Sequence, residues 1–223
     1  MKPQSYELFF QTKMPLIDSL YKDNFTRIIC WKTEESDEEL LEFLQLSPYR
    51  IMKYLTLTPK QGKEYLGLRA CLKVLDLDLE IYYDDKGKPY LPANNQISIT
   101  HSYNMVCVGL SEFNIGIDIE KSRPAKIHNI KEKFVRAQDE AVWIPKENES
   151  DYLHVIWGIK EGLYKLNGGN LWNFLHHYRV EPFELKEKSP IKCWISDEIK
   201  SRKYFAHYTK VEDYYLVWVL DYE

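Results

Sequence analysis

Two carboxylates alternate with isoleucines in the segment NIGIDIEK, residues 114–121. Successive side chains of a β-strand point to opposite faces, so the isoleucines share one face while Asp118 and Glu120 share the other. The apolar face indicates burial against a core. Two like charges side by side mildly disfavour folding unless a positive group neutralises them. The pattern is therefore typical either of a solvated strand face or of a cation site.

A helix predicted over residues 151–167 carries a second group of charged side chains. Its apolar stripe is interrupted by Lys160, and Glu161 and Lys165 stand one turn apart. An exposed Glu–Lys pair of this kind stabilises a helix by only a few tenths of a kcal/mol. Lys160 could equally extend its ammonium group past the apolar stripe into solvent.

Two glycines inside this helix favour a less ordinary role. Gly158 and Gly162 each cost about 1 kcal/mol relative to alanine in a helix interior, which indicates close backbone approach to another element. If Glu161 joined the two strand carboxylates, the three would form half of an oxygen shell for Mg²⁺, which is commonly completed by substrate phosphates. Lys160 and Lys165 would then be free to hold phosphate oxygens.

The elements that must position these groups are marked by capping and turn signals. Ser36 with Glu39, and Thr58 with Gln61, are capping boxes that predict two helices, the second followed by a turn around Gly87. Short strands are predicted for QISITHS, for MVCVGLSE and, as a pair, for residues 203–223. Between residues 121 and 150 the chain is charged and less periodic, with one helix expected near residues 127–134.

Bulk composition narrows the class of protein. The 223 residues fit one large or two small domains, and the formal charge of −4 gives no reason to expect a nucleic-acid binder. The four cysteines are far apart and form no CxxC pair, which favours a reducing cytosol and argues against a zinc site. No apolar run is long enough to span a membrane, and residues 1–13 lack a signal-peptide core, so we expect a cytoplasmic chain.

The two glycine-containing helical segments share a spacing pattern. EYLGLRACLKVL aligned with VIWGIKEGLYKL matches Gly67 with Gly158 and Arg69 with Lys160. Each helix is followed by a histidine and an apolar strand. This weak repeat is compatible with two similar halves.

The motifs GKPYLP, SITHS, GIDIE and WGIKEGLYKL, in this order, resemble those of the 4′-phosphopantetheinyl transferases. The resemblance is greatest to the single-chain type that activates surfactin synthetase, and it is good over residues 88–169. It implies an α+β fold of two similar halves related by a pseudo-two-fold axis, residues 1–112 and 113–223. The N-terminal half would bind the nucleotide end of coenzyme A, and the active site would lie in the cleft between the halves.

The resemblance also implies an activity. Such an enzyme transfers the phosphopantetheine arm of coenzyme A to a serine of an apo acyl or peptidyl carrier protein and releases adenosine 3′,5′-bisphosphate, as a holo-carrier-protein synthase. It requires Mg²⁺ and, in this type, is expected to be a monomer without nucleic-acid or membrane partners.

The same resemblance assigns roles to individual residues. Asp118, Glu120 and Glu161 match the magnesium ligands, with Glu161 also a candidate to activate the carrier serine. Lys165 and Lys160 match catalytic lysines near the pyrophosphate. The expected coenzyme A contacts are Lys88, His101, Ser102 and Arg69.

Two features depart from the family pattern or extend it. Gly158 replaces the usual Ser, Thr or Cys, and Gly162 replaces Ala or Ser, which puts the local geometry in question. The carrier's acidic recognition helix is expected to meet a basic and apolar patch within residues 121–142 that contains Arg123, Lys126, Lys131, Lys133 and Arg136.

Two alternative functions remain open at this stage. One is a protein of the same fold that binds coenzyme A or a carrier protein without transferring phosphopantetheine. The complete set of charged motif residues argues against this alternative. The other is a different Mg²⁺-dependent phosphotransferase, against which the lack of a P-loop or kinase motif argues. The identity of the carrier, the tolerance for acylated coenzyme A and the N-terminal contacts to the 3′-phosphate do not follow from the sequence.

Overall fold

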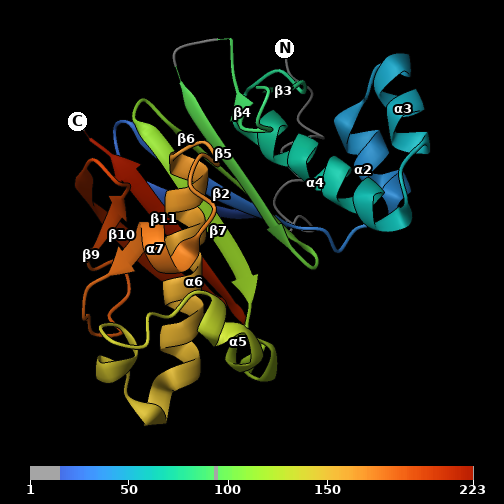
Figure 1. Ribbon diagram of the computed structural model, residues 1–223. Helices are drawn as coiled ribbons and strands as arrows, with labels where there is room; N and C mark the ends of the chain where they lie inside the picture. The colour runs from blue at the N-terminus through green and yellow to red at the C-terminus, as the bar shows by residue number, and fades with distance from the viewer. Residues whose placement is uncertain (1–15, 93–94, 223) are drawn as a thin grey trace.

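The computed structural model describes residues 16–92 and 95–222. It is an α+β fold whose two larger antiparallel sheets are each covered on the outer face by one long helix, and β3 pairs with β4 in a separate two-stranded sheet (Figure 1). The α+β expectation is confirmed. Among the described residues no helix is long and apolar enough to cross a membrane.

The first sheet has the strand order β1-β2-β6-β5 and comes from the N-terminal part of the chain. Its face away from the second sheet is covered by α4, whose buried side chains form one core with β2, β5 and β6. The elements are β1 (Leu16–Lys22), β2 (Thr26–Lys32), α2 (Asp37–Leu44), α3 (Pro48–Leu55), α4 (Pro59–Val74), β3 (Tyr82–Tyr83), β4 (Pro89–Tyr90), β5 (Gln96–Ser102) and β6 (Met105–Ser111).

The second sheet has the order β7-β11-β10-β9-β8 and is covered by α6. Its elements are β7 (Asn114–Lys121), α5 (Pro124–Ile130), three short 3₁₀ helices (Lys131–Lys133, Ala141–Trp143, Lys146–Asn148), α6 (Glu149–Leu166), α7 (Phe174–His177), β8 (Tyr178–Val180), β9 (Ile191–Ser196), β10 (Ser201–Val211) and β11 (Tyr214–Asp221).

The sequence signals located most of the elements that flank the site. Both predicted capping boxes are formed, by Ser36 with Glu39 and by Thr58 with Gln61. The predicted helix over residues 151–167 is α6, and the strands predicted around QISITHS, MVCVGLSE and the C-terminal tail are β5, β6, β10 and β11. The helix expected near residues 127–134 is shorter and lies earlier, as α5. The strands β1, β2, β8 and β9 and the helix α3 were not predicted.

A third apolar cluster joins the two sheets. The isoleucines of β7 pack with β11 against the inner faces of β2 and β6, where Cys30 and Cys107 lie on neighbouring strands. These two cysteines are linked by a disulfide, a pairing that was not predicted from the sequence. The other two, Cys71 and Cys193, are free and buried.

Because the isoleucines of β7 face the first sheet, the polar face of β7 turns toward α6. The contact between β7 and α6 is backbone against backbone: a Cβ atom added to Gly116 would lie 1.9 Å from the carbonyl oxygen of Gly162. A Cβ on Gly158 would lie 2.5 Å from Val217 Cγ2. The close approach thus requires glycine at position 116 of β7 and at position 158 of α6, and the second explains one departure of this chain from the family pattern.

This contact predicts different effects for two glycine substitutions. Gly116→Ala should destabilise the fold by at least about 1–3 kcal/mol, because backbone atoms of α6 must move. Gly162→Ala should be nearly neutral, because its Cβ would lie 3.2 Å from Val219 Cγ2 and alanine favours the helix by about 1 kcal/mol. Urea unfolding of both variants checks this, and equal losses of stability would contradict the described packing.

Candidate active site

The three predicted carboxylates come together where β7 meets α6. Asp118 and Glu120 project from the polar face of β7, and Glu161 lies on the turn of α6 that packs against it. The negative charges of Asp118 and Glu120 both raise the pKa of Glu161, which places the three groups within electrostatic reach of one another. Burial is the larger cause, and together these effects raise the pKa of Glu161 to about 7.

Two cations already lie against these carboxylates. Lys165 donates from Nζ to Asp118 Oδ1 at 2.8 Å and to the carbonyl oxygen of Ile117 at 2.9 Å. Arg123 donates from Nη2 to Glu120 Oε2 at 3.2 Å. The second oxygen of Asp118, Oδ2, is buried and has no hydrogen-bond partner. That oxygen is therefore placed to accept a further positive group.

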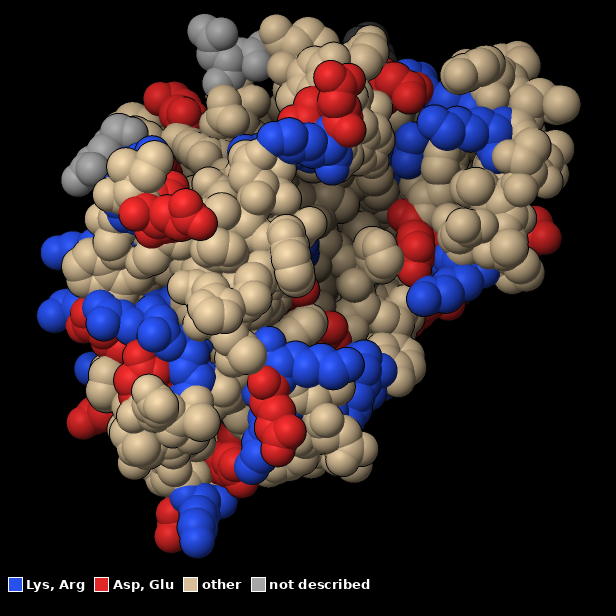
Figure 2. Space-filling model, in the orientation of Figure 1, with Lys and Arg blue, Asp and Glu red and all other residues tan. Residues whose placement is uncertain are grey.

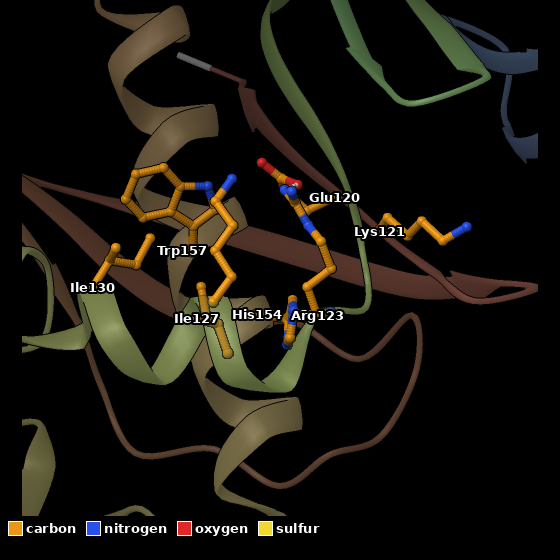
Figure 3. Close-up of a pocket in the computed structure, with 8 residues that line it drawn as sticks. Glu120, Lys121, Arg123, Ile127, Ile130, His154 and Trp157 are labelled. Atoms are coloured by element: carbon orange, nitrogen blue, oxygen red, sulfur yellow. Dashed lines mark hydrogen bonds and ion pairs between the residues drawn. The ribbon is translucent and has the colours of Figure 1, made fainter.

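The surroundings of Glu120 show how Arg123 is held (Figure 3). Arg123 extends toward Glu120, whereas Lys121 points away from it. Below Arg123, the buried imidazole of His154 accepts a hydrogen bond from the Arg123 backbone N–H at 3.0 Å through Nε2, and its Nδ1–H donates to the carbonyl oxygen of Ser150 at 2.7 Å. Burial lowers the pKa of His154, so the neutral imidazole fixes the start of α5.

Two hollows flank the carboxylates. The larger, about 880 Å³, runs from Lys60 of α4 past His101 and Ser102 to Glu120 and the basic residues at the start of α5. A smaller one, about 180 Å³, includes Lys88 and Lys165 in its lining. The space-filling view is hollowed between the α4 and α6 sides, with acidic side chains in the hollow and basic ones below it, over α5 (Figure 2).

Most of the predicted coenzyme A contacts line these hollows. The imidazole of His101 is half exposed, with Nδ1 lying 3.2 Å from Glu64 Oε1 of α4. Lys88 donates from Nζ to Asn114 Oδ1 at 2.9 Å and to the carbonyl oxygen of Leu166 at 3.2 Å, and burial lowers its pKa. Ser102 is buried and donates to Glu120 Oε2 at 3.2 Å, so its hydroxyl serves the carboxylate.

Arg69 lies outside both hollows. Its guanidinium carbon lies 3.5 Å from the centre of the Tyr65 ring, its Nη1 donates to the Tyr65 carbonyl oxygen at 3.4 Å, and the residue is only 5% exposed. Burial lowers its pKa. A guanidinium packed in this way is not available to a phosphate of coenzyme A, so the predicted contact is wrong for this structure.

Lys160 also departs from the prediction. Its side chain is fully buried, and Nζ donates to Glu140 Oε2 at 2.7 Å and to the carbonyl oxygen of Phe134 at 2.5 Å. The Glu140 carboxylate also accepts the backbone N–H groups of Arg136 and Val180, each at 2.8 Å. Lys160 therefore anchors the segment between α5 and α6 and is not free to hold phosphate oxygens.

Glu140 is the residue that the sequence reasoning missed. It stands in an irregular segment without periodicity, and its partners come from three separate parts of the chain. The one sequence signal was the lysine inside the apolar stripe of α6, because a buried cation requires a buried anion.

The comparisons with known proteins agree with the motifs. A model of the 4′-phosphopantetheinyl transferase superfamily matches residues 114–219, which include all three carboxylates and Lys165. Over these residues the chain is similar to this superfamily. The matched segment does not include Lys88, His101 or Ser102.

Three relatives in Bacillus subtilis are each similar to part of the chain. The 4′-phosphopantetheinyl transferase Sfp of strain 168 is 29% identical over 97 residues, which are 42% of this chain and 43% of that protein. The 4′-phosphopantetheinyl transferase ffp is 30% identical over 98 residues, with the same shares. A third 4′-phosphopantetheinyl transferase is 33% identical over 109 residues, 46% of this chain and 48% of that protein. The chain thus spans about half the length of the curated relatives it matches.

The raised pKa of Glu161 predicts how one substitution acts on stability. The carboxyl group ionises near pH 4.5 in the unfolded chain and near pH 7 in the folded one, so wild-type stability falls as pH rises through this interval. Glu161→Gln removes that loss. With EDTA present, the variant should gain about 1–3 kcal/mol relative to wild type at pH 8 and much less at pH 5. Thermal unfolding at both pH values checks this, and an equal effect at the two would contradict it.

The burial of Lys160 predicts a structural effect of its loss. Lys160→Met leaves the Glu140 carboxylate buried without its cation and should destabilise the fold by about 3–5 kcal/mol. The double variant Lys160→Met, Glu140→Gln should recover most of that loss, because no buried charge remains. Urea unfolding of the two variants measures both effects. A single variant that folds as stably as wild type would contradict a structural role for Lys160.

Proposed function

We propose that this chain transfers the 4′-phosphopantetheine group of coenzyme A to a serine hydroxyl of an apo acyl or peptidyl carrier protein, in a Mg²⁺-dependent reaction. The observation that carries the proposal is the meeting of Asp118, Glu120 and Glu161 with Lys165 at the contact of β7 and α6. The match of residues 114–219 to the superfamily and the names of the relatives support the same reaction class.

The three carboxylates suit a hard divalent cation by charge and by donor type. Burial, together with repulsion by Asp118 and Glu120, raises the pKa of Glu161, and Asp118 Oδ2 has no hydrogen-bond partner. Among the residues described, however, no three His, Cys, Asp or Glu side chains already surround one metal position. Binding of Mg²⁺ by Asp118, Glu120 and Glu161 would therefore require Lys165 and Arg123 to shift. The cation would neutralise charge on the pyrophosphate of coenzyme A and polarise the phosphoryl group.

Phosphoryl transfer needs charge neutralisation and in-line positioning more than covalent help. Lys165 lines the smaller hollow beside Asp118 and is available to a pyrophosphate oxygen once it leaves the carboxylate. The serine oxygen forms a bond to the phosphorus of phosphopantetheine, and the bond from that phosphorus to the bridging oxygen breaks. Adenosine 3′,5′-bisphosphate leaves with that oxygen.

Glu161 is the group best suited to accept the serine proton. Its pKa of about 7 places it near the value that suits a general base at neutral pH. Its position on α6, one turn before Lys165, keeps the base beside the lysine that would hold the leaving group. Lys88 and His101, in the hollows on either side, would contact the nucleotide part of coenzyme A.

The carrier protein would dock over the start of α5. Lys121, Arg123 and Lys126 line the larger hollow, and Ile127, Ile130 and Trp157 line an apolar recess beside it. A basic rim with an apolar centre suits an acidic, amphipathic helix. Two members of the expected patch are less suited, because Lys131 pairs with Glu149 and Arg136 pairs with Asp139. We place this activity in the cytoplasm.

Intact-mass spectrometry of an apo carrier protein tests the proposal. Incubation with this protein, coenzyme A and Mg²⁺ should add one phosphopantetheine to the carrier. EDTA or Asp118→Asn should reduce the rate by about 10²-fold or more, because the charge on the pyrophosphate is no longer neutralised.

Arg69→Gln is the control variant, because it removes a basic side chain that lies outside both hollows. The fraction of this variant that is folded should transfer phosphopantetheine at the wild-type rate. Coenzyme A binding without any mass gain, across several unrelated apo carriers, would support the binding-only alternative instead.

A further inference from the structure

Three hydroxyl side chains at alternate positions of β5 join this strand to β7. The two strands run in the same direction, one at the edge of each sheet, and the link between them is made by side chains of β5 to the main chain of β7. Each hydroxyl oxygen accepts a hydrogen bond from a backbone N–H of β7, at 3.1, 3.1 and 3.2 Å respectively: Ser98 from Ile117, Thr100 from Ile119, and Ser102 from Lys121.

Two of these hydroxyls also donate their protons to the site carboxylates. Thr100 Oγ1 lies 3.2 Å from Asp118 Oδ1, and Ser102 Oγ lies 3.2 Å from Glu120 Oε2. At the corresponding earlier position, beside Ser98, β7 carries Gly116 in place of a carboxylate. The row of hydroxyls therefore continues along β5, but only its second and third members meet an acidic side chain.

The hydrogen bond from Thr100 fixes which oxygen of Asp118 remains available. Thr100 and Lys165 both donate to Oδ1, and Oδ2 is left without a partner. Thr100 is 4% exposed and Asp118 is 6% exposed, so water does not compete for these positions. When Lys165 turns to a phosphate, Thr100 still holds the carboxylate in the same orientation.

We propose that Thr100 and Ser102 are positioning residues that orient Asp118 and Glu120 toward the divalent cation, an inference that rests on the proposed function. Hydrogen-bond partners of metal ligands orient those ligands, and their loss typically weakens metal binding 10- to 100-fold. The two hydroxyls come from the N-terminal sheet, whereas the carboxylates come from the C-terminal sheet. The cation site would therefore be complete only when β5 and β7 are docked.

The test compares Thr100→Val with Ser98→Ala. Both variants lose one hydroxyl link between the strands, but only the first also loses a bond to a carboxylate. Thr100→Ser retains the hydroxyl and serves as the rescue variant. Mn²⁺, which is visible by electron paramagnetic resonance, replaces Mg²⁺ as the probe, at a fixed saturating concentration of coenzyme A, and urea unfolding is measured in parallel.

Thr100→Val should weaken Mn²⁺ binding by about 10-fold or more. Ser98→Ala and Thr100→Ser should bind Mn²⁺ within about 2-fold of wild type, although Ser98→Ala loses stability as Thr100→Val does. Ser102→Ala, a milder change at the next position, should weaken Mn²⁺ binding as well, through Glu120.

Suppose that the unmodified protein binds Mn²⁺ and modifies a carrier. If Thr100→Val and Ser102→Ala then bind Mn²⁺ as tightly as the unmodified protein does, this inference is overturned and the proposed function is not. A wild type that neither binds Mn²⁺ nor transfers phosphopantetheine would overturn the proposed function, and this inference with it.

Discussion

The contact of α6 with β7 is the constraint on which the candidate site depends. Gly116 and Gly162 meet backbone to backbone, and Gly158 lies against Val217 on the neighbouring strand. A larger separation would move Glu161 and Lys165 away from the polar face of β7. Each glycine of α6 lowers the stability of this element as a helix, and the close interface with the sheet offsets this loss. The same interface sets the spacing of the three carboxylates.

The same helix-on-sheet arrangement occurs in the N-terminal part of the chain without the chemistry. A Cβ on Gly67 of α4 would approach Val106 on β6, as a Cβ on Gly158 of α6 would approach Val217 on β11. The strand residue paired with Val217 is Asp118, whereas the one paired with Val106 is Trp31. In the helices, the position that aligns with Glu161 is Ala70, which is fully buried. The packing is thus similar in the two copies, but the positions of Asp118 and Glu161 are acidic in only one of them.

The sequence predicted the carboxylates correctly because strand alternation and helix spacing are local. It failed for the two buried cations because their burial depends on how the rest of the chain packs around each helix. Arg69 and Lys160, which align in the repeat, are both buried, one against Tyr65 and the other against Glu140. A family motif cannot show whether a lysine points into the cleft or into the core, and nothing in the irregular segment around Glu140 marked it as the partner. The Cys30–Cys107 link was missed for the same reason, since it requires knowing that β2 and β6 are neighbours.

The hydroxyls of β5 show that the segment matched by the superfamily model does not contain the whole candidate site. The superfamily model begins at residue 114 and contains every predicted metal ligand, yet Thr100 and Ser102 lie before it. Parallel strands at the edges of two sheets usually pair through their backbones, but here side chains occupy that place. Each of the two hydroxyls both accepts from β7 and donates to its acid, so the link between the sheets and the orientation of the ligands share the same atoms. A change at Thr100 or Ser102 that loosens the junction of the sheets therefore also disturbs a carboxylate, which ties the stability of the fold to the geometry of the site at these two positions.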